Sequence, residues 1–154
     1  MSTALLERHP LMARLPAAQL DQIARFGAIE SWNPGEDVVR EGSLGDALYL
    51  VLTGRVAVRT GGQVLADLRS GDFFGEMSLV EPATRSATVT AVEPAFLFRL
   101  PHEALRQLLT DDPTAASVLL VQIVKTLSER LRRGNHTLAS VGALADWLAG
   151  SSMV

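Results

Sequence analysis

The chain has 154 residues, which is the size of one domain with a proper buried core. Hydrophobic residues make up 47% and charged residues 20%, so the composition is that of a globular domain rather than a disordered segment. The net charge of −3 gives the chain as a whole no attraction for nucleic acid or anionic lipid. The absence of cysteine excludes disulfides, thiol catalysis and cysteine-bound zinc.

The beginning of the chain predicts its compartment. Glu7, Arg8 and His9 fall where a signal peptide would have an apolar run. Elsewhere the apolar stretches are a few residues long, far short of a membrane span. We therefore expect a cytoplasmic protein without a membrane partner.

Residues 1–27 form a helical entry. Pro16 begins a predicted helix, and Gly27 stands where its C-terminal cap would be. The spacing places four apolar residues on one face of this helix: Leu20, Ile23, Ala24 and Phe26.

Residues 28–101 have the character of β-structure. Short runs of β-forming residues alternate with turn signals such as Pro34-Gly35 and Gly61-Gly62. Their spacing of about 8–12 residues favours an antiparallel sandwich or barrel over a parallel sheet. We predict an α+β, mainly β fold with helices at both ends. The predicted strands are 37–41, 47–52, 55–60, 63–68, 86–92 and 95–100.

Residues 102–150 return to helical periodicity and complete a single domain, 1–154. A short helix over 102–109 is followed by a break at Asp111-Asp112-Pro113. Gly134-Asn135 can divide the helix that begins there, because glycine is a poor interior residue. Apolar residues then recur at four- and three-residue steps for about four heptads. They predict either a dimer seam or a helix packed on its own barrel: Leu120, Val124, Leu127, Leu131, Leu138, Val141, Ala145 and Leu148.

The run GDFFGEMSLVEPATRSATVTA, residues 71–91, carries the chemistry. Gly75 permits a tight turn and lets an anion approach the main chain, and a helical turn starting there aims free N–H groups at that anion. Arg85 supplies the forked donors that a phosphate needs, and the Ser86 hydroxyl can donate once more. Glu76 would repel a phosphate, so it suits a sugar hydroxyl of the same ligand.

These residues resemble a known cassette. FGEMSL and RSATVTA match the phosphate-binding cassette of the cyclic nucleotide-binding domain family, FGE-x-[SA]-L followed by R-[STA]-A-x-V-x-A. Upstream turns, such as Pro34-Gly35-Glu36 and Gly45-Asp46, also fit, and the resemblance covers roughly residues 10–135. It implies a jelly-roll β-barrel that binds cAMP or cGMP as a regulatory sensor and needs no other cofactor.

The resemblance also implies residue roles. Glu76 would accept the ribose 2′-hydroxyl, and Arg85 would pair with the cyclic phosphate with help from Ser86. The cassette residues implied as the nucleotide site are Gly75, Glu76, Met77, Ser78, Arg85, Ser86 and Ala87, with backbone N–H groups donated near Gly75, Ser78 and Ala87. Phe74, Met77 and Leu79 would pack the cassette itself.

The base is expected to have a wall and a cap. Leu65 and Leu68 are the candidates for the apolar wall. Asn135 is the candidate cap, with Arg132, Arg133 and Trp147 as alternatives. In the family, alanine after the arginine tends to go with cAMP, and serine or threonine can favour cGMP. Bacterial cAMP-responsive regulators also carry serine there, so Ser86 leaves the choice open with cAMP favoured.

Three other readings compete with a ligand sensor. Glu76 and Arg85 could be a surface ion pair worth under about 1 kcal/mol. The chain could be a scaffold or dimerisation module, or a fragment of a larger protein. An enzyme would need a metal centre or an activated nucleophile, and His9, His102 and His136 all lie outside the strand-rich region. We expect no enzyme activity and no metal.

The sequence after Arg133 bears on partners. It contains no lysine or arginine, so we expect no DNA binding by this chain, because DNA affinity needs cationic contacts to phosphates. A homodimer through the C-terminal helices is possible, and the downstream partner is not indicated. The expected mechanism is a ligand-driven shift of the C-terminal helices.

Overall fold

The computed structural model describes residues 4–76 and 84–133, the last of these without its side chain. All six predicted strands are present: β2 (Asp37–Val39), β3 (Ala47–Thr53), β4 (Arg55–Thr60), β5 (Gln63–Arg69), β7 (Thr88–Ala91) and β8 (Ala95–Pro101). Two further strands were not predicted, β1 (Ala28–Trp32) and β6 (Phe73–Phe74).

The strands form two antiparallel sheets. One has the order β1-β8-β3-β6 and the other β2-β7-β4-β5, so neighbours in each sheet come from distant parts of the sequence. The predicted α+β, mainly β fold of jelly-roll type is confirmed. Among the described residues the pairing gives two sheets facing each other, not one ladder closed into a barrel.

The sequence of strand β3 is apolar almost throughout because both faces of the strand are buried. Leu48, Leu50 and Leu52 point to a core shared with the helices, while Tyr49 and Val51 point into the sandwich between the sheets. A strand covered on both faces does not alternate between apolar and polar residues. Strand β3 therefore separates the two cores of the domain.

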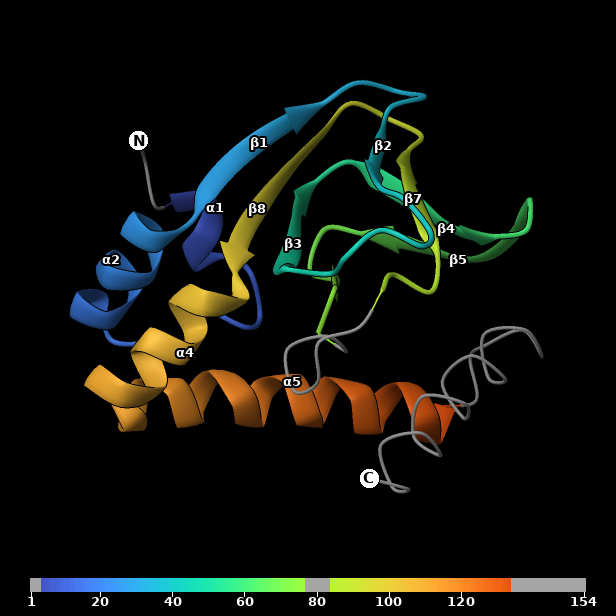
Figure 1. Cartoon of the computed structure of the whole chain (residues 1–154). Helices are drawn as coiled ribbons and strands as arrows, with labels where there is room; N and C mark the ends of the chain where they lie inside the picture. Colours follow the sequence, from blue (N-terminus) through green and yellow to red (C-terminus); the bar gives the residue numbers. More distant parts are fainter. Residues whose placement is uncertain (1–3, 77–83, 134–154) are drawn as a thin grey trace.

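Four described helices flank this sandwich: α1 (Ala4–Glu7), α2 (Ala17–Phe26), α4 (His102–Asp111) and α5 (Pro113–Arg133). Helices α1, α2 and α4 gather beside β1 and β8, and the long α5 runs beneath both sheets (Figure 1). None of the described helices is long and apolar enough to cross a bilayer.

The predicted face of α2 is partly wrong. Leu20 and Ile23 are buried, but Phe26 is 44% exposed. Gly27 does cap α2, with its N–H donating to the Ile23 carbonyl. Its backbone is extended, so the glycine is required by space: a Cβ would collide with Phe98 and lie 2.6 Å from the Arg99 carbonyl oxygen.

The predicted heptad seam of α5 is divided between two faces. Leu120 and Leu127 pack against the domain's own core, whereas Val124 is 62% and Leu131 45% exposed. The residues that anchor α5 are Ala115, Ala116, Leu119 and Ile123. Over 113–133 the helix therefore packs on its own sandwich. The predicted seam residues Leu138, Val141, Ala145 and Leu148 lie outside the described residues.

Candidate ligand-binding site

Gly75 begins the candidate site immediately after β6. Its φ of +92° lies in the left-handed region that residues with a Cβ avoid. A Cβ on Gly75 would collide with the Ala47 carbonyl oxygen and lie 2.8 Å from Nη1 of Arg85. Glycine is required here both by the turn and by the side chain that packs against it.

Arg85 is held by its main chain as well as its side chain. Its N–H donates to the Ser43 carbonyl at 2.6 Å, and the Gly42 N–H donates to the Arg85 carbonyl at 2.9 Å. The guanidinium donates from Nη2 to the Ala47 carbonyl at 3.0 Å. Its central carbon also lies 5.9 Å from the centre of the Tyr49 ring, within cation–π range.

Arg85 is surrounded by groups of both charges. Burial lowers the pKa of Arg85, while Tyr49, Asp46 and Glu76 raise it by electrostatic attraction. Arg99 lowers this pKa by repulsion. An arginine remains charged throughout the ordinary pH range. The guanidinium is therefore a partly desolvated cation at the edge of the sandwich.

Glu76 follows Gly75 and is also partly buried. Burial raises the pKa of its carboxyl group above the ordinary value. The backbone N–H of Glu76 and the guanidiniums of Arg130 and Arg85 act in the opposite direction. Glu76 thus lies within the electrostatic reach of Arg85, whose guanidinium packs against the neighbouring Gly75.

The other predicted site residues that the structure describes differ in their exposure. Ser86 is exposed, and its carbonyl accepts a hydrogen bond from Thr60 Oγ1 at 3.1 Å, while Ala87 is partly buried. Phe74 is buried and stacked on Tyr49 at 4.9 Å between ring centres. Four predicted residues lie outside the described part of the chain: Met77, Ser78, Leu79 and Asn135.

The predicted base wall lies on β5. Leu68 pairs with Val56 and packs against the core between the sheets. Leu65 is partly buried and lies where the register with β4 shifts. Of the alternative caps, Arg132 is exposed on α5, while the Arg133 side chain and Trp147 are not described.

A pocket of about 360 Å³ opens beside Arg85. Its walls come from β2, the turn that follows β2, Tyr49 and Arg99. Glu76, Leu65 and Leu68 are not among the residues that line it. Arg85 thus lines a pocket on the β2 side, while Glu76 lies outside that lining and within electrostatic reach of Arg130 on α5.

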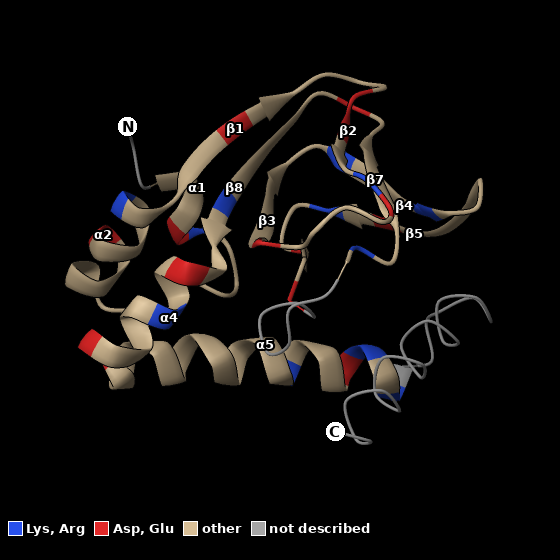
Figure 2. Ribbon diagram, in the orientation of Figure 1, with Lys and Arg blue, Asp and Glu red and all other residues tan. Residues whose placement is uncertain are grey.

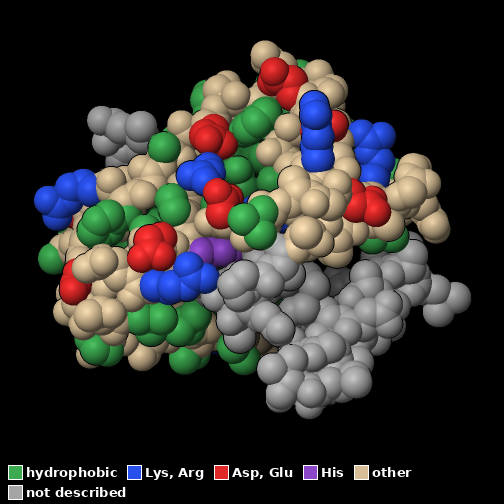
Figure 3. Space-filling model, in the orientation of Figure 1, with side chains coloured by type: hydrophobic (Ala, Val, Ile, Leu, Met, Phe, Trp, Pro, Cys, Tyr) green, Lys and Arg blue, Asp and Glu red, His purple; other side chains and the backbone are tan. Residues whose placement is uncertain are grey.

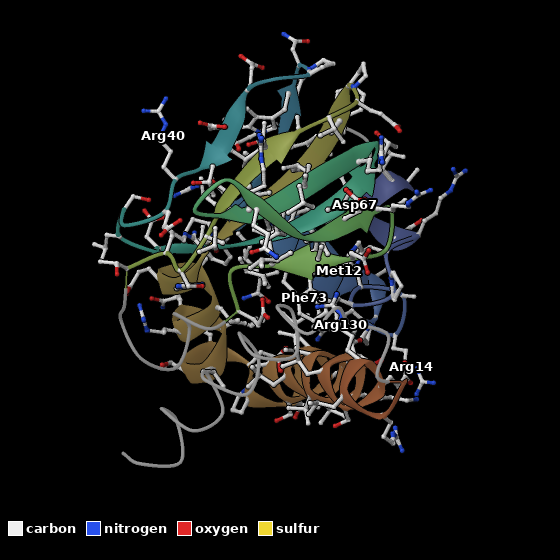
Figure 4. The ribbon with its side chains drawn as sticks, turned by 90° about the vertical axis from the view of Figure 1, so that its right-hand side faces the viewer. Met12, Arg14, Arg40, Asp67, Phe73 and Arg130 are labelled. Carbon is white, nitrogen blue, oxygen red and sulfur yellow. The ribbon has the colours of Figure 1, made fainter. Side chains whose placement is uncertain are left out.

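Arg130 on α5 was not predicted as a site residue. Its Nη2 lies 3.3 Å from Asp72 Oδ1, and its guanidinium carbon lies 4.8 Å from the centre of the Phe73 ring. Figure 4 shows Arg130 and Phe73 side by side between α5 and the strands. Arg130 therefore connects α5 to the residues immediately before the candidate site.

Two histidines also reach this region, although neither belongs to a strand. His102, the first residue of α4, is 2% exposed and has Nε2 at 2.9 Å from the Gly75 carbonyl oxygen. His9 has Nε2 at 2.9 Å from the Asp72 carbonyl oxygen. Within residues 4–76 and 84–133, no group of histidine, aspartate or glutamate side chains could hold a metal ion. His136 lies outside the described residues.

The surface charge is mixed rather than gathered by sign. Acidic and basic side chains are interspersed with hydrophobic ones on the face shown in Figure 3. On α5 the charged residues lie in the second half, near the candidate site (Figure 2). The ion pairs among the described residues are likewise spread over the domain, as in Arg55–Glu93, Arg99–Asp46 and Arg130–Asp72.

The chain is similar in sequence to known proteins. A cyclic AMP receptor protein from Thermus thermophilus is 36% identical over 125 residues, 78% of this chain and 58% of the relative. A cGMP-dependent protein kinase from Toxoplasma gondii is 38% identical over 95 residues, 62% of this chain. This chain spans only 10% of that kinase, so it matches one domain of a larger protein.

A solved structure matches over most of its length. The N-terminal domain of a transcriptional regulator from Streptomyces coelicolor A3(2) superposes with a TM-score of 0.67 at 32% identity, covering 85% of this chain and 92% of that one. The family model of the cyclic nucleotide-binding domain matches residues 29–112, more than half of the chain. The chain therefore belongs to the cyclic nucleotide-binding domain family.

Proposed function

We propose that this domain binds a cyclic nucleotide through residues 75–87 and acts as a regulatory sensor. Arg85 pairs with the cyclic phosphate, and Glu76 accepts a hydrogen bond from the ribose 2′-hydroxyl. The observation that carries the proposal is the packing around Gly75, where the Arg85 guanidinium lies against the turn that presents Glu76. A cation packed against the turn that carries an anion suits the two ends of a ribose phosphate.

The cost of burying Glu76 supports a ligand role. A carboxyl group whose pKa is raised by burial destabilises the folded protein at neutral pH. Such a group is common at functional sites, where a ligand supplies the missing partner. A sugar hydroxyl donating to Glu76 would provide this partner without adding charge.

The phosphate contacts require donors beyond Arg85. Backbone N–H groups near residues 75, 78 and 87 and the Ser86 hydroxyl complete the set in our proposal. Ser86 is exposed, so its hydroxyl is accessible to a ligand. Leu65 and Leu68 form the wall beside the base, and Asn135 is the proposed cap.

The preference between bases follows from the same residues. We favour cAMP and accept cGMP, because Ser86 after the arginine is compatible with both. The related proteins include a cyclic AMP receptor protein and a cGMP-dependent protein kinase.

Ligand binding is proposed to act on α5. Arg130 is paired with Asp72 and lies within electrostatic reach of Glu76, so a change at Glu76 alters the forces on this helix. A ligand shifts α5 only to the extent that it binds one position of the helix better than another.

A second proposed role is self-association through α5. The exposed residues Val121, Val124 and Leu131 follow three- and seven-residue spacings compatible with a helix pair. The alternative is that the domain serves as a scaffold, or is part of a larger regulated protein. Val121→Asp with Val124→Asp should give a monomer by sedimentation if this face forms the seam, and an unchanged dimer would exclude it. Leu127 is unsuitable for this test, because it packs against the domain's own core.

We propose binding without catalysis and without DNA recognition by this chain. Incubation with cAMP should leave the nucleotide unhydrolysed, and formation of 5′-AMP would contradict the proposal. A fluorescent DNA duplex should show no sequence-specific binding with or without cAMP, whereas a specific shift would contradict it.

A thermal unfolding experiment tests the proposed function. Saturating cAMP or cGMP should stabilise the protein by about 2.7 kcal/mol at a hundredfold excess over Kd. Linear 5′-AMP is the matched control, because it has the same base and sugar without the cyclic phosphate. A melting temperature that neither cyclic nucleotide shifts would overturn the proposal.

A further inference from the structure

His102 lies behind the turn that the proposed ligand would contact. Its imidazole is 2% exposed, and Nε2 lies 2.9 Å from the Gly75 carbonyl oxygen. A carbonyl can only accept, so Nε2 must carry the proton in this contact. The main-chain N–H of His102 also donates to the Asp46 carbonyl at 2.9 Å. His102 is thus fixed at both its backbone and its ring.

The geometry of one peptide unit links His102 to the ligand side of the turn. The Gly75 carbonyl and the Glu76 N–H belong to the same planar trans peptide, so they point in opposite directions. The Glu76 N–H interacts with the carboxylate of its own side chain. The bond from His102 to the Gly75 carbonyl therefore also fixes the direction of the Glu76 N–H, which lies on the opposite side of the same peptide and beside the proposed sugar-binding carboxylate.

We infer that His102 is a positioning residue for nucleotide binding: its Nε2–H holds the Gly75 carbonyl and so aims the Glu76 N–H and carboxylate at the ligand. This inference rests on the proposed function. It assigns His102 no contact with the nucleotide. It also explains how α4, which begins at His102, is joined to the turn.

The charges around His102 keep it in the required form. Burial lowers its pKa, and the guanidiniums of Arg85 and Arg106 act in the same direction. The bond to the Gly75 carbonyl and the carboxylate of Asp46 act in the opposite direction. A neutral imidazole protonated at Nε2 satisfies the contact and adds no charge beside Arg85.

The chain contains a matched control for this histidine. His9 is also buried, and its Nε2 lies 2.9 Å from the Asp72 carbonyl oxygen. The Leu11 N–H donates to its Nδ1, which assigns the proton of His9 to Nε2 as well. Asp72 keeps a second main-chain partner, because the Val51 N–H donates to the same carbonyl at 2.9 Å. Replacing His9 therefore removes a similar bond without freeing the Gly75–Glu76 peptide.

Calorimetric titration with cAMP should separate the variants. His102→Leu fills the buried position with an apolar side chain but removes the donor, and it should bind about tenfold more weakly than the wild type. His102→Gln retains an N–H donor and should recover most of the affinity. His9→Leu should bind like the wild type. Equal affinity of His102→Leu and the wild type would overturn the inference, as would equal losses in the Leu and Gln variants of His102.

A measurement on the unaltered chain covers the case in which a variant fails to fold. The ¹⁵N shifts of the His102 ring should show a neutral imidazole protonated at Nε2 at pH 7, and protonation at Nδ1 alone would overturn the inference. This measurement also separates the two proposals. Absence of cAMP and cGMP binding by the wild type would end the proposed function, whereas the ring protonation would still decide the contact with Gly75.

Discussion

Arg85 packs directly against Gly75, so close that a single added carbon on Gly75 would lie 2.8 Å from its Nη1. The glycine of the cassette therefore makes room for the arginine of the cassette. The two residues are ten positions apart in the chain, and the intervening segment has to bring the guanidinium back to the point where the turn begins.

This packing predicts a large effect of Gly75→Ala. The φ of +92° costs a residue with a Cβ about 1–2 kcal/mol, and the collision with the Ala47 carbonyl adds to this. Gly35→Ala is the matched control, because Gly35 has a φ of +90° and nothing within 4 Å of the added Cβ. Urea unfolding should show a clearly larger loss for Gly75→Ala. Equal losses for the two variants would mean that the close packing carries no energy.

Glu76→Gln should stabilise the ligand-free protein at pH 7 while weakening nucleotide binding. The raised pKa means that folding disfavours the charged carboxylate, so the penalty is fully present above the folded-state pKa. The penalty disappears as the pH falls below the ordinary value of 4.5, because the carboxyl group is then protonated in both states. Urea unfolding at pH 7 and pH 4 measures this difference. Glu41→Gln, at an exposed position, should change stability by less than about 0.5 kcal/mol.

Acidification should destabilise the domain through His9 and His102. Burial lowers the pKa of both imidazoles below the ordinary value of 6.5. As the pH falls below 6.5, the unfolded chain takes up protons that the folded chain refuses, and stability is lost down to the folded-state pKa. Each histidine contributes a slope of at most about 1.4 kcal/mol per pH unit. Unfolding free energies between pH 7.5 and 5 should show this slope, reduced in His9→Gln and His102→Gln. A slope that neither glutamine variant changes would contradict it, because Glu76 acts in the opposite direction in all of these proteins.

Arg130→Met should loosen α5 in the ligand-free protein. The change removes the pair with Asp72 and the cation–π contact with Phe73, which together are worth about 1 kcal/mol at a partly exposed site. Amide hydrogen exchange of residues 113–133 should become faster by a factor of about 5. Arg132→Met removes an exposed arginine from the same helix and should leave exchange unchanged.

Adding cAMP to the wild type should also change the amide hydrogen exchange of residues 113–133, and identical protection with and without ligand would end the helix-shift mechanism.

The strands were predictable where composition and turns agree. Both β3 and β8 lie in apolar runs bounded by glycine or proline, and both appear where predicted. In contrast, β1 has the mixed run AIESW with no turn residue directly before it except Gly27, which looked like a helix cap. Strand β6 has two residues and exists because it pairs with Tyr49 and Leu50, a distant partner that local sequence does not indicate.

The orientation of α5 shows what spacing alone cannot determine. Alternating four- and three-residue steps form two neighbouring rows on an α-helix, and here Leu120 and Leu127 make one row while Val124 and Leu131 make the other. Leu127 turns toward the core and Val124 toward solvent, although both fit the same heptad pattern. Packing against the sandwich, which the sequence of the helix does not contain, decides between them.

The cassette residues of the candidate site could be predicted from the sequence, whereas the residues that contact the cassette from other elements could not. Glu76 and Arg85 were predicted from the cassette pattern, whose order and spacing are specific. His102 and Arg130 belong to helices 26 and 54 residues beyond Glu76, and each looks like an ordinary helix residue. Only tertiary structure brings the imidazole of His102 to the Gly75 carbonyl and the guanidinium of Arg130 to Asp72.

Calorimetric titration of cAMP into the wild type and Arg85→Ala tests the central claim most directly. We predict saturable binding by the wild type and at least a hundredfold weaker binding by the variant, because charge-assisted hydrogen bonds to the phosphate contribute about 3 kcal/mol. The variant should remain folded, as shown by a cooperative urea transition. Undiminished affinity in folded Arg85→Ala would contradict the assignment of the phosphate to this residue.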